Sequence, residues 1–277
     1  MNAGPGDRWQ PVLSDEDIVK QFCWIVLDAV GTLIKPEPDV ATAYRDVGVK
    51  FGVNLSLDEV RNRFRVAFAK TESRDLNGDN SDPERERSGA ETSEGIEEQR
   101  WRRIVGTVLP EASDSEACFR MLFEHFAQPD AWRCFADVEP CLDWCRESGY
   151  RLAVASNFDA RLNSICDGLP PLAVIEQRFI SSEIGFRKPA TEFFECVLDR
   201  IGCSPGDVLF VGDDETNDVI GPRRVGMTAV LLDRNESGNR NESGNGEAEH
   251  RSSEKVVRSL TELVDRISNS ELKERRV

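Results

Sequence analysis

The feature that most constrains the fold is an alternation of short apolar segments with helical segments after Asp137. Two of the apolar segments, residues 209–211 and 229–232, are apolar at every position, which suits strands buried on both faces. Strands that are joined by helices form parallel sheets through right-handed crossovers. We therefore predict a doubly wound, Rossmann-like α/β sheet with strands at 24–27, 151–155, 178–181, 208–211 and 228–232 and helices at 138–148, 159–166, 191–200 and 217–225.

A helical insert interrupts this pattern between residues 38 and 135. Its apolar residues recur at helical spacing, for example at Val40, Tyr44 and Val47. The middle of the insert, residues 71–95, is polar and charged, so it cannot bury enough apolar surface to offset the entropy lost on ordering. We predict a mobile loop there.

The segments outside these two parts are polar or short. A six-residue sequence that begins at Arg234 is repeated from Arg240, in a stretch that predicts disorder. Residues 256–267 have the pattern of a short amphipathic helix. The expected boundaries are 1–22 for an N-terminal tail, 23–37 and 136–232 for the core domain, 38–135 for the insert, 233–253 for a disordered loop and 254–277 for a C-terminal helix and tail.

Charge and composition exclude several classes of function. The net charge of −16 argues against binding of nucleic acid, which requires clustered Lys and Arg. No segment has the roughly 20 apolar residues of a membrane helix, and the N-terminus does not resemble a signal peptide, so we expect a cytoplasmic protein that binds no membrane. The eight cysteines form no C-x-x-C motif and there are only two histidines, which disfavours zinc. Nothing in the sequence indicates a protein partner.

Polar residues follow several of the predicted strands. Asp28 ends the first strand, Ser156 and Asn157 end the second, and Asp213 follows a later one, while Lys188 precedes a helix. Open parallel sheets bind ligands beyond the carboxyl ends of their strands. Each residue alone has an ordinary explanation as a turn or helix cap, but together, in this order, they indicate an active site.

The acidic residues of this group suit a Mg²⁺ site, because Mg²⁺ prefers hard oxygen ligands such as carboxylates. Asp28 and Asp213 are the expected pair of ligands, with the backbone oxygen of Val30 within reach and Asp214 and Asp218 as further carboxylates. A carboxylate can also attack phosphorus and form an acyl phosphate, so we predict Asp28 as the nucleophile.

The remaining polar residues suit a phosphate group. We predict that Lys188 binds both Asp28 and a phosphate oxygen as a point charge. Ser156, Asn157 and backbone N–H groups near them are expected to contact the substrate, with Ser156 and Lys188 assisting catalysis.

These residues lie in motifs that resemble those of the haloacid dehalogenase (HAD) superfamily. The matching motifs are Asp28-Ala-Val-Gly-Thr-Leu33, Ser156-Asn157, Lys188-Pro189 and Gly212-Asp213-Asp214-x-x-Asn217-Asp218. Within the superfamily, the first motif and Ser156-Asn157-Phe158-Asp159-x-Arg161-Leu162 resemble the subfamily of haloacid dehalogenase-like hydrolase domain-containing protein 3 and the fly rhythmically expressed gene 2 protein. The resemblance covers residues 25–232 and implies that the insert is a type C1 cap that closes over the site.

One position departs from the phosphatases of this superfamily. They usually carry an acid–base Asp two residues after the nucleophile, where this chain has Val30. Three readings follow. The acidic residues favour a Mg²⁺-dependent phosphatase acting on a small phosphorylated metabolite. Val30 leaves open a binding or regulatory protein with weak turnover. A 2-haloacid dehalogenase is the third reading, although such enzymes use no metal.

Overall fold

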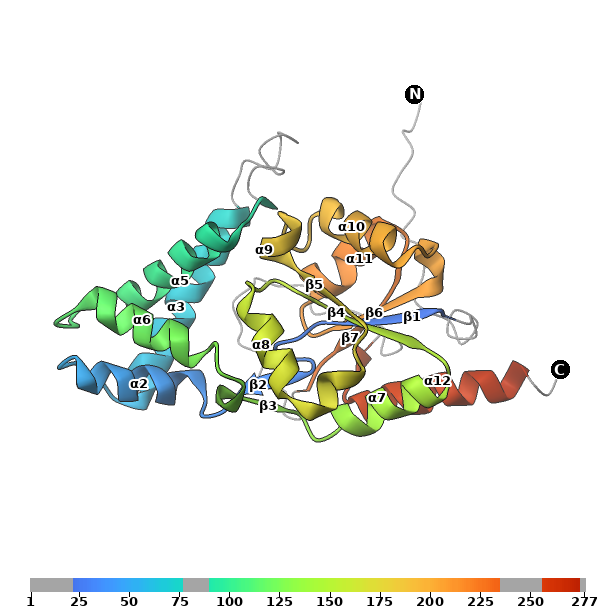
Figure 1. Cartoon of the computed structure of the whole chain (residues 1–277), viewed down its shortest axis with the longest axis horizontal. Helices are drawn as coiled ribbons and strands as arrows, with labels where there is room; N and C mark the ends of the chain where they lie inside the picture. The colour runs from blue at the N-terminus through green and yellow to red at the C-terminus, as the bar shows by residue number, and fades with distance from the viewer. Residues whose placement is uncertain (1–21, 77–89, 235–255, 275–277) are drawn as a thin grey trace, which may run out of the picture.

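The computed structural model describes residues 22–76, 90–234 and 256–274. It consists of a sheet flanked by helices and, to one side of the sheet, a separate group of helices (Figure 1). The predicted N-terminal tail and the tandem repeat from Arg234 lie, apart from their borders, outside the described residues. None of the described helices is long and apolar enough to cross a membrane.

The sheet is parallel throughout. Its strands are β1 (Trp24–Leu27), β4 (Arg151–Ser156), β5 (Gln177–Ile180), β6 (Val208–Gly212), β7 (Thr228–Leu232) and β8 (Val256–Val257). They lie in the order β5-β4-β1-β6-β7-β8, so the chain builds outward from β1 on one side and then on the other. Leu27 pairs with both Val154 and Val211, which aligns the carboxyl ends of the three central strands. The predicted doubly wound sheet is confirmed.

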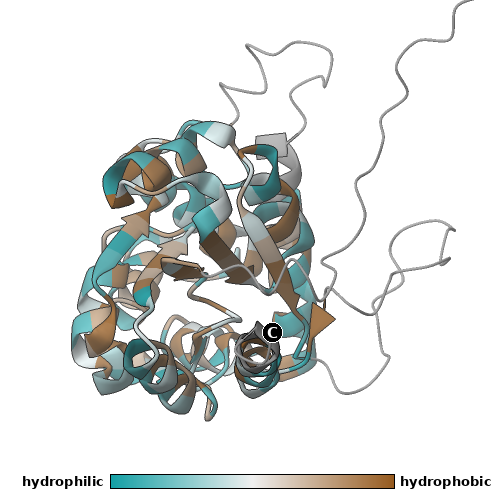
Figure 2. Ribbon diagram, turned by 90° about the vertical axis from the view of Figure 1, so that its right-hand side faces the viewer, coloured by the Kyte–Doolittle hydropathy of each residue, from teal (hydrophilic) through white to brown (hydrophobic). Residues whose placement is uncertain are grey.

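Helices cover both faces of the sheet. On one face lie α7 (Val138–Glu147), α8 (Arg161–Gly168) and α12 (Leu260–Glu274), and on the other α10 (Thr191–Ile201) and α11 (Gly221–Arg224). Side chains of β1 alternate between them: Ile25 and Leu27 join the first core, and Trp24 and Val26 the second. Figure 2 accordingly shows largely apolar strands in the interior and helices in which polar and apolar residues alternate.

The group of helices to the side of the sheet is formed by α2 (Val40–Lys50), α3 (Leu57–Leu76), α5 (Glu94–Val108) and α6 (Ser115–His125). We call these four helices the helical insert. The chain enters it after β2 (Ile34–Pro36) and returns through β3 (Trp132–Cys134), which pair as antiparallel strands. The insert has its own core, which includes the buried residues Tyr44, Ile104 and Phe119. It therefore packs as a separate unit beside the sheet (Figure 1).

Short helical segments join the larger elements of the core. They are the turns η1 (Pro129–Ala131), η2 (Pro170–Val174) and η3 (Pro205–Asp207), the helix α9 (Ser181–Ile184) and the π-helix η4 (Glu215–Ile220). The single helix predicted at 217–225 was wrong, because η4 and α11 share this stretch. Pro222 lacks an N–H, so the regular hydrogen-bond ladder cannot continue through it.

The mobile loop predicted at 71–95 was wrong at both ends, and residues 77–89 lie outside the described residues. Helix α3 continues to Leu76, and the Thr71 hydroxyl donates to the Ala67 carbonyl at 2.8 Å. Helix α5 begins at Glu94, where Ser93 caps it by accepting from the Ile96 N–H. A helix satisfies the hydrogen-bonding groups of its own backbone, so polar residues can extend it without burying apolar surface.

The C-terminal segment also differs from its prediction at one end. Val256 and Val257, predicted as helix, form β8 at the sheet edge, where Val256 pairs with Leu231. The helix begins only at Leu260. Two consecutive β-branched residues suit a strand, and these two form one because the edge of the sheet at β7 is available for pairing.

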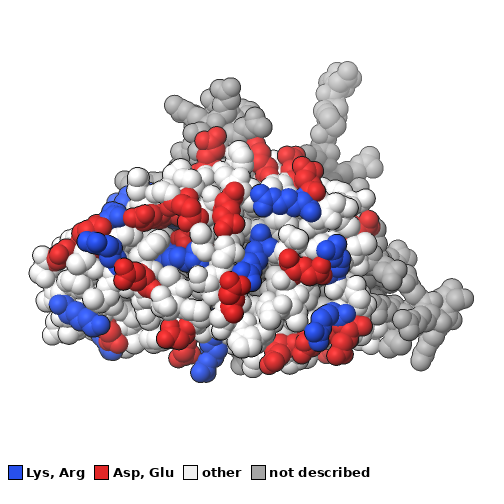
Figure 3. All heavy atoms as spheres, in the orientation of Figure 1, with Lys and Arg blue, Asp and Glu red and all other residues white. Residues whose placement is uncertain are grey.

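Charged residues are spread over the surface. On the face shown in Figure 3, the basic and acidic side chains of the described residues are intermingled. Many form local pairs, such as Arg102 with Glu98 on α5 and Arg266 with Glu262 on α12. Exposed pairs of this kind each contribute only about 0.3–0.5 kcal/mol, so they do not determine the fold.

Candidate active site

Asp28 lies at the carboxyl end of the central strand β1. Its N–H donates to the Val211 carbonyl at 2.9 Å, which continues the ladder between β1 and β6 by one residue. The residue is 6% exposed. A buried carboxylate requires compensating charge or hydrogen bonds, so its neighbours determine what it can do.

Asp213 follows the neighbouring strand β6 and lies against the turn after Asp28. The Thr32 hydroxyl donates to its Oδ1 at 3.5 Å. Gly31 adopts a φ of +92°, and a Cβ atom on it would lie 2.2 Å from Asp213 Oδ2. Gly31 therefore provides both a left-handed backbone and the space for this carboxylate.

Asp218 reaches the same place from η4. Its Oδ2 accepts from the Asp214 N–H at 3.0 Å, and the residue is 1% exposed. Gly212 makes room for it, because a Cβ atom there would lie 2.3 Å from the Asp218 carboxylate. The sequence Gly212-Asp213-Asp214 thus supplies the Asp213 carboxylate and leaves space at Gly212 for the Asp218 carboxylate.

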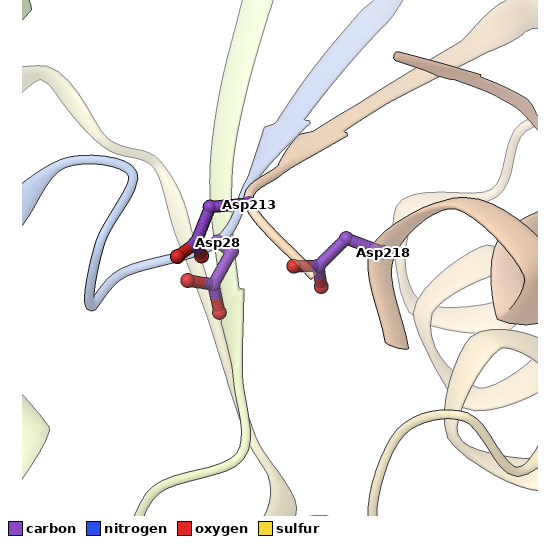
Figure 4. Close-up of side chains that lie close together, drawn as sticks. All are labelled: Asp28, Asp213 and Asp218. Atoms are coloured by element: carbon purple, nitrogen blue, oxygen red, sulfur yellow. The ribbon is translucent and has the colours of Figure 1, made fainter. Parts of the chain in front are cut away.

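The three carboxylates converge on one point. Asp28, Asp213 and Asp218 each offer an oxygen, and these oxygens lie within 4.8 Å of one another. Figure 4 shows the Asp28 and Asp213 side chains next to each other, with Asp218 facing them from its helix. Three hard oxygen donors at this spacing fit a divalent cation such as Mg²⁺.

Lys188 is the cation of this group and is only 4% exposed. Its Nζ donates to Asp28 Oδ1 at 2.8 Å, to Asp218 Oδ1 at 2.6 Å and to the Ala155 carbonyl at 2.9 Å. Burial by itself would lower the pKa of Lys188, but the negative charges of Asp218 and Asp28 outweigh it and raise that pKa. The ammonium group is therefore charged at any physiological pH.

The charges of the site do not balance without a further cation, since Lys188 offsets only one of three carboxylates. Asp213 is exposed at the edge of the site, yet desolvation among its neighbours and the charges of Asp28 and Asp218 raise the pKa of its carboxyl to about 7. Desolvation and the charge of Asp28 raise the pKa of Asp218 to about 6, against the lowering effect of Lys188. A divalent cation would supply the missing positive charge and favour the ionised forms.

Ser156 and Asn157, the two residues predicted after the second strand, lie at the carboxyl end of β4. Ser156 ends the strand and is 3% exposed. Both polar atoms of the Asn157 amide bind the backbone of Lys188: Nδ2 donates to its carbonyl at 2.9 Å, and Oδ1 accepts from its N–H at 2.7 Å. Asn157 thus holds Lys188 in place, a role that the sequence did not indicate. Its contact with substrate stays a prediction.

Two predicted metal ligands lie outside the group of three carboxylates. Asp214 is exposed, and its side chain caps η4 by accepting from the Asn217 N–H at 2.7 Å. Val30 presents an apolar side chain that is 36% exposed, so this position offers no acid or base. Whether its backbone oxygen binds a metal stays a prediction.

Comparison with known proteins identifies the family of this fold and site. A family model described as haloacid dehalogenase-like hydrolase matches residues 24–226, a stretch that contains Asp28, Lys188 and Asp218. The chain belongs to the haloacid dehalogenase-like hydrolase family. The resemblance noted in the sequence motifs is therefore confirmed, and members of the HAD family are generally enzymes that catalyse hydrolysis.

Several curated relatives align over much of this HAD-like hydrolase. Haloacid dehalogenase-like hydrolase domain-containing protein 3 of Danio rerio is 27% identical over 89% of this chain and 97% of its own length. The rhythmically expressed gene 2 protein of Drosophila melanogaster is 22% identical over 77% of this chain and 84% of its own. A ribulose-1,5-bisphosphate 5-phosphatase of Halopiger xanaduensis is 28% identical over 48% of this chain and 56% of its own.

Solved structures share the HAD-like fold at low sequence identity. A magnesium-bound HAD hydrolase from Bacillus subtilis has a TM-score of 0.66 and 15% identity, and covers 90% of this chain and 100% of its own. An L-2-haloacid dehalogenase from Xanthobacter autotrophicus has a TM-score of 0.63 and 15% identity, and covers 89% and 98%. These likenesses support the parallel sheet with flanking helices.

Proposed function

We propose that this HAD-like hydrolase is a Mg²⁺-dependent phosphatase of a small phosphorylated metabolite, with Asp28 as the nucleophile. The observation that carries this proposal is the convergence of three carboxylates and one buried ammonium at the carboxyl edge of the sheet. Mg²⁺, held by Asp28, Asp213 and Asp218, would neutralise charge on the phosphoryl oxygens during transfer. The phosphatase among the relatives supports the same class of substrate.

In this mechanism the two oxygens of the Asp28 carboxylate have different roles. Lys188 binds Oδ1, which fixes the side-chain rotamer and leaves Oδ2 for attack on phosphorus. The attack forms a bond between Oδ2 and phosphorus and breaks the ester bond, and the departing alkoxide takes a proton from water. A second water molecule then attacks phosphorus and gives up a proton to solvent, which breaks the bond between Oδ2 and phosphorus, releases inorganic phosphate and restores the Asp28 carboxylate. Lys188 stabilises the added negative charge in both steps.

The acidic group argues against the dehalogenase reading. Displacement of halide by a carboxylate requires one nucleophile and a site for the substrate carboxylate. Here Asp213 and Asp218 would face that anionic substrate, and Lys188 already offsets part of their charge. In a phosphatase, the same two residues would bind a divalent cation that lies between them and the phosphate. The helical insert would then serve as the cap over this substrate.

The test is turnover of a panel of small phosphate esters with Mg²⁺ and with a chelator. We expect phosphate release that chelation abolishes and added Mg²⁺ restores. Release of halide from 2-halo acids in the presence of chelator is the outcome that would instead support the dehalogenase reading. Activity on phosphate esters that is indifferent to chelation would contradict the proposed role of the three carboxylates.

Val30 supports a second candidate, a HAD-fold binding or regulatory protein with weak turnover. The side chain offers no proton to the leaving alkoxide and no base for the water, and such groups typically contribute 10²–10⁴-fold. We expect Val30→Asp to raise kcat by about 10²-fold on esters with poor leaving groups.

Val30→Asn is the matched control, because the Asn side chain has nearly the same shape as that of Asp but cannot exchange a proton at neutral pH. An equal gain in both variants would show that polarity rather than acid–base chemistry is responsible. Strong turnover by the natural protein would exclude the weak-turnover candidate.

The raised pKa values predict how the stability of the metal-free protein depends on pH. The pKa of Asp213 rises from 3.8 to about 7, so between these values the folded protein keeps a proton that the unfolded chain has lost. The contribution of Asp213 to the free energy of unfolding should therefore decrease as the pH rises from about 4 to about 7. Chemical denaturation of the natural protein and of Asp213→Asn would measure it. The variant should lack this decrease, and saturating Mg²⁺ should reduce it.

A further inference from the structure

The loop that carries Lys188 is paired with the helical insert. Residues 90–92, which lead into helix α5 of the helical insert, and residues 185–187 of the core form a short antiparallel bridge. The Arg187 N–H donates to the Ala90 carbonyl at 2.9 Å, and a second bond of 2.9 Å returns from the Thr92 N–H to the core segment. The pairing ends one residue before Lys188.

A buried ion pair strengthens this contact. Glu97, in the first turns of α5, is 2% exposed, and its Oε1 accepts from the Arg187 guanidinium and from the Thr92 hydroxyl, the latter at 2.7 Å. Glu97 therefore joins both strands of the bridge. Removing one partner of a buried pair leaves an uncompensated charge, so these side chains are strongly coupled.

A second acidic residue of the same helix docks on the core nearby. Glu94 accepts from the Ser182 hydroxyl in α9 and from the Ala160 N–H at 3.0 Å. The start of α5 thus lies beside α9, as Figure 1 shows, away from the strands β2 and β3 through which the insert is connected. The insert has a third attachment to the core, and this attachment includes the residue next to Lys188.

We propose that Glu97 and Arg187 are positioning residues, through which docking of the helical insert sets the place of Lys188 relative to Asp28. Lys188 is held from two sides: Asn157 binds its own backbone groups, and the bridge with the insert holds Arg187 immediately before it. A docked insert keeps the ammonium on Asp28, and an undocked insert releases one of the two anchors. The catalytic part of this inference rests on the proposed function, whereas the mechanical part does not.

The test compares Glu97→Gln with Glu98→Gln on the same helix. Glu97→Gln keeps the shape and an acceptor for Thr92 but removes the charge that holds Arg187. Glu98 is exposed and pairs with Arg102, so its variant controls for loss of a carboxylate on α5. Hydrogen exchange at residues 90–92 and 185–188, kcat and KM on the best phosphate ester, and thermal unfolding are measured for each.

For Glu97→Gln we expect at least about tenfold faster exchange in both segments together, because their pairing opens more often. We expect kcat to fall by about tenfold or more with KM changed less than twofold, since Lys188 acts on the reacting group rather than on the rest of the substrate. Glu98→Gln should match the natural protein. A Glu97→Gln protein that is less stable but has unchanged kcat would overturn the proposal, as would exchange equal to that of the control.

Two further measurements keep the inference testable. If Glu97→Gln does not fold, Arg187→Lys replaces it, because it retains the charge and loses the guanidinium geometry. Labelling of Lys188 by an amine-selective ester, mapped by mass spectrometry, reports its release without any turnover. If exchange and labelling are faster in Glu97→Gln but the natural protein hydrolyses no ester, the docking is upheld and the proposed function is refuted. If labelling is unchanged in Glu97→Gln while the natural protein hydrolyses esters, the docking is refuted and the proposed function is upheld.

Discussion

Replacing Asp28 with Asn is expected to reduce kcat/KM on phosphate esters by at least about 10³-fold while leaving the protein as stable as before. The loss of activity follows because an amide cannot form the acyl phosphate. Stability should be kept because the change removes one of three carboxylates that share a single ammonium group. Lys188 retains its bond to Asp218, and the amide oxygen can still accept from it.

The separation of activity from stability is what makes this substitution informative. The same change also removes a charge that raises the pKa of Asp213, so that pKa should fall in Asp28→Asn. Steady-state kinetics and thermal unfolding measure the two effects, and Asp58→Asn, an exposed residue in α3, controls for the chemistry of the change. Activity within tenfold of the natural protein would rule out Asp28 as the nucleophile.

Replacing Lys188 with Met should lower stability, unlike Asp28→Asn, and should also lower activity. The variant leaves Asp28 and Asp218 without the only cation that contacts them among the described residues. Breaking a buried ion pair on one side typically costs about 3–5 kcal/mol, so we expect the free energy of unfolding to fall by this order. The kcat should fall by about 10²–10³-fold, the typical result of removing one donor to a developing negative charge.

The pH dependence distinguishes this mechanism from a simple packing defect. Below about pH 6, Asp213 and Asp218 take up protons because their pKa values are raised, so the loss in Lys188→Met should shrink there. Combining the variant with Asp28→Asn should restore part of the stability, because one carboxylate fewer is left unpaired. Lys50→Met, an exposed change on α2, is the control. Equal losses at pH 5 and pH 8 would contradict the electrostatic account.

Much of the fold and the acidic group could be predicted from the sequence because both depend on local patterns. A buried strand such as β1 is an apolar run that ends at a polar residue, and its neighbours in the sheet have the same form. Parallel strands bring their carboxyl ends to one edge, so Asp28 and Asp213 were expected together although far apart in the chain. Lys188, which precedes a predicted helix, was expected in the same group.

For several polar residues, the partner could not be predicted from the sequence. Asp214 and Asp218 are similar residues on one short segment, yet Asp218 points into the site and Asp214 caps the helix. The amide of Asn157 is bound to the Lys188 backbone, and its contact with substrate stays a prediction. The same polar atoms can bind a ligand, a helix end or another loop, and sequence spacing does not distinguish these partners.

The sequence by itself determined the alternation of strands and helices, the edge of the sheet at which the polar residues gather, and the separate core of the insert. The reason is that burial of apolar side chains follows a period that is visible in the chain. Only the tertiary structure decided that Lys188, which was predicted to bind Asp28, also binds Asp218, and that Glu97 of the insert reaches the loop beside it. These contacts join residues more than 25 positions apart, and their geometry depends on how two separately packed units meet.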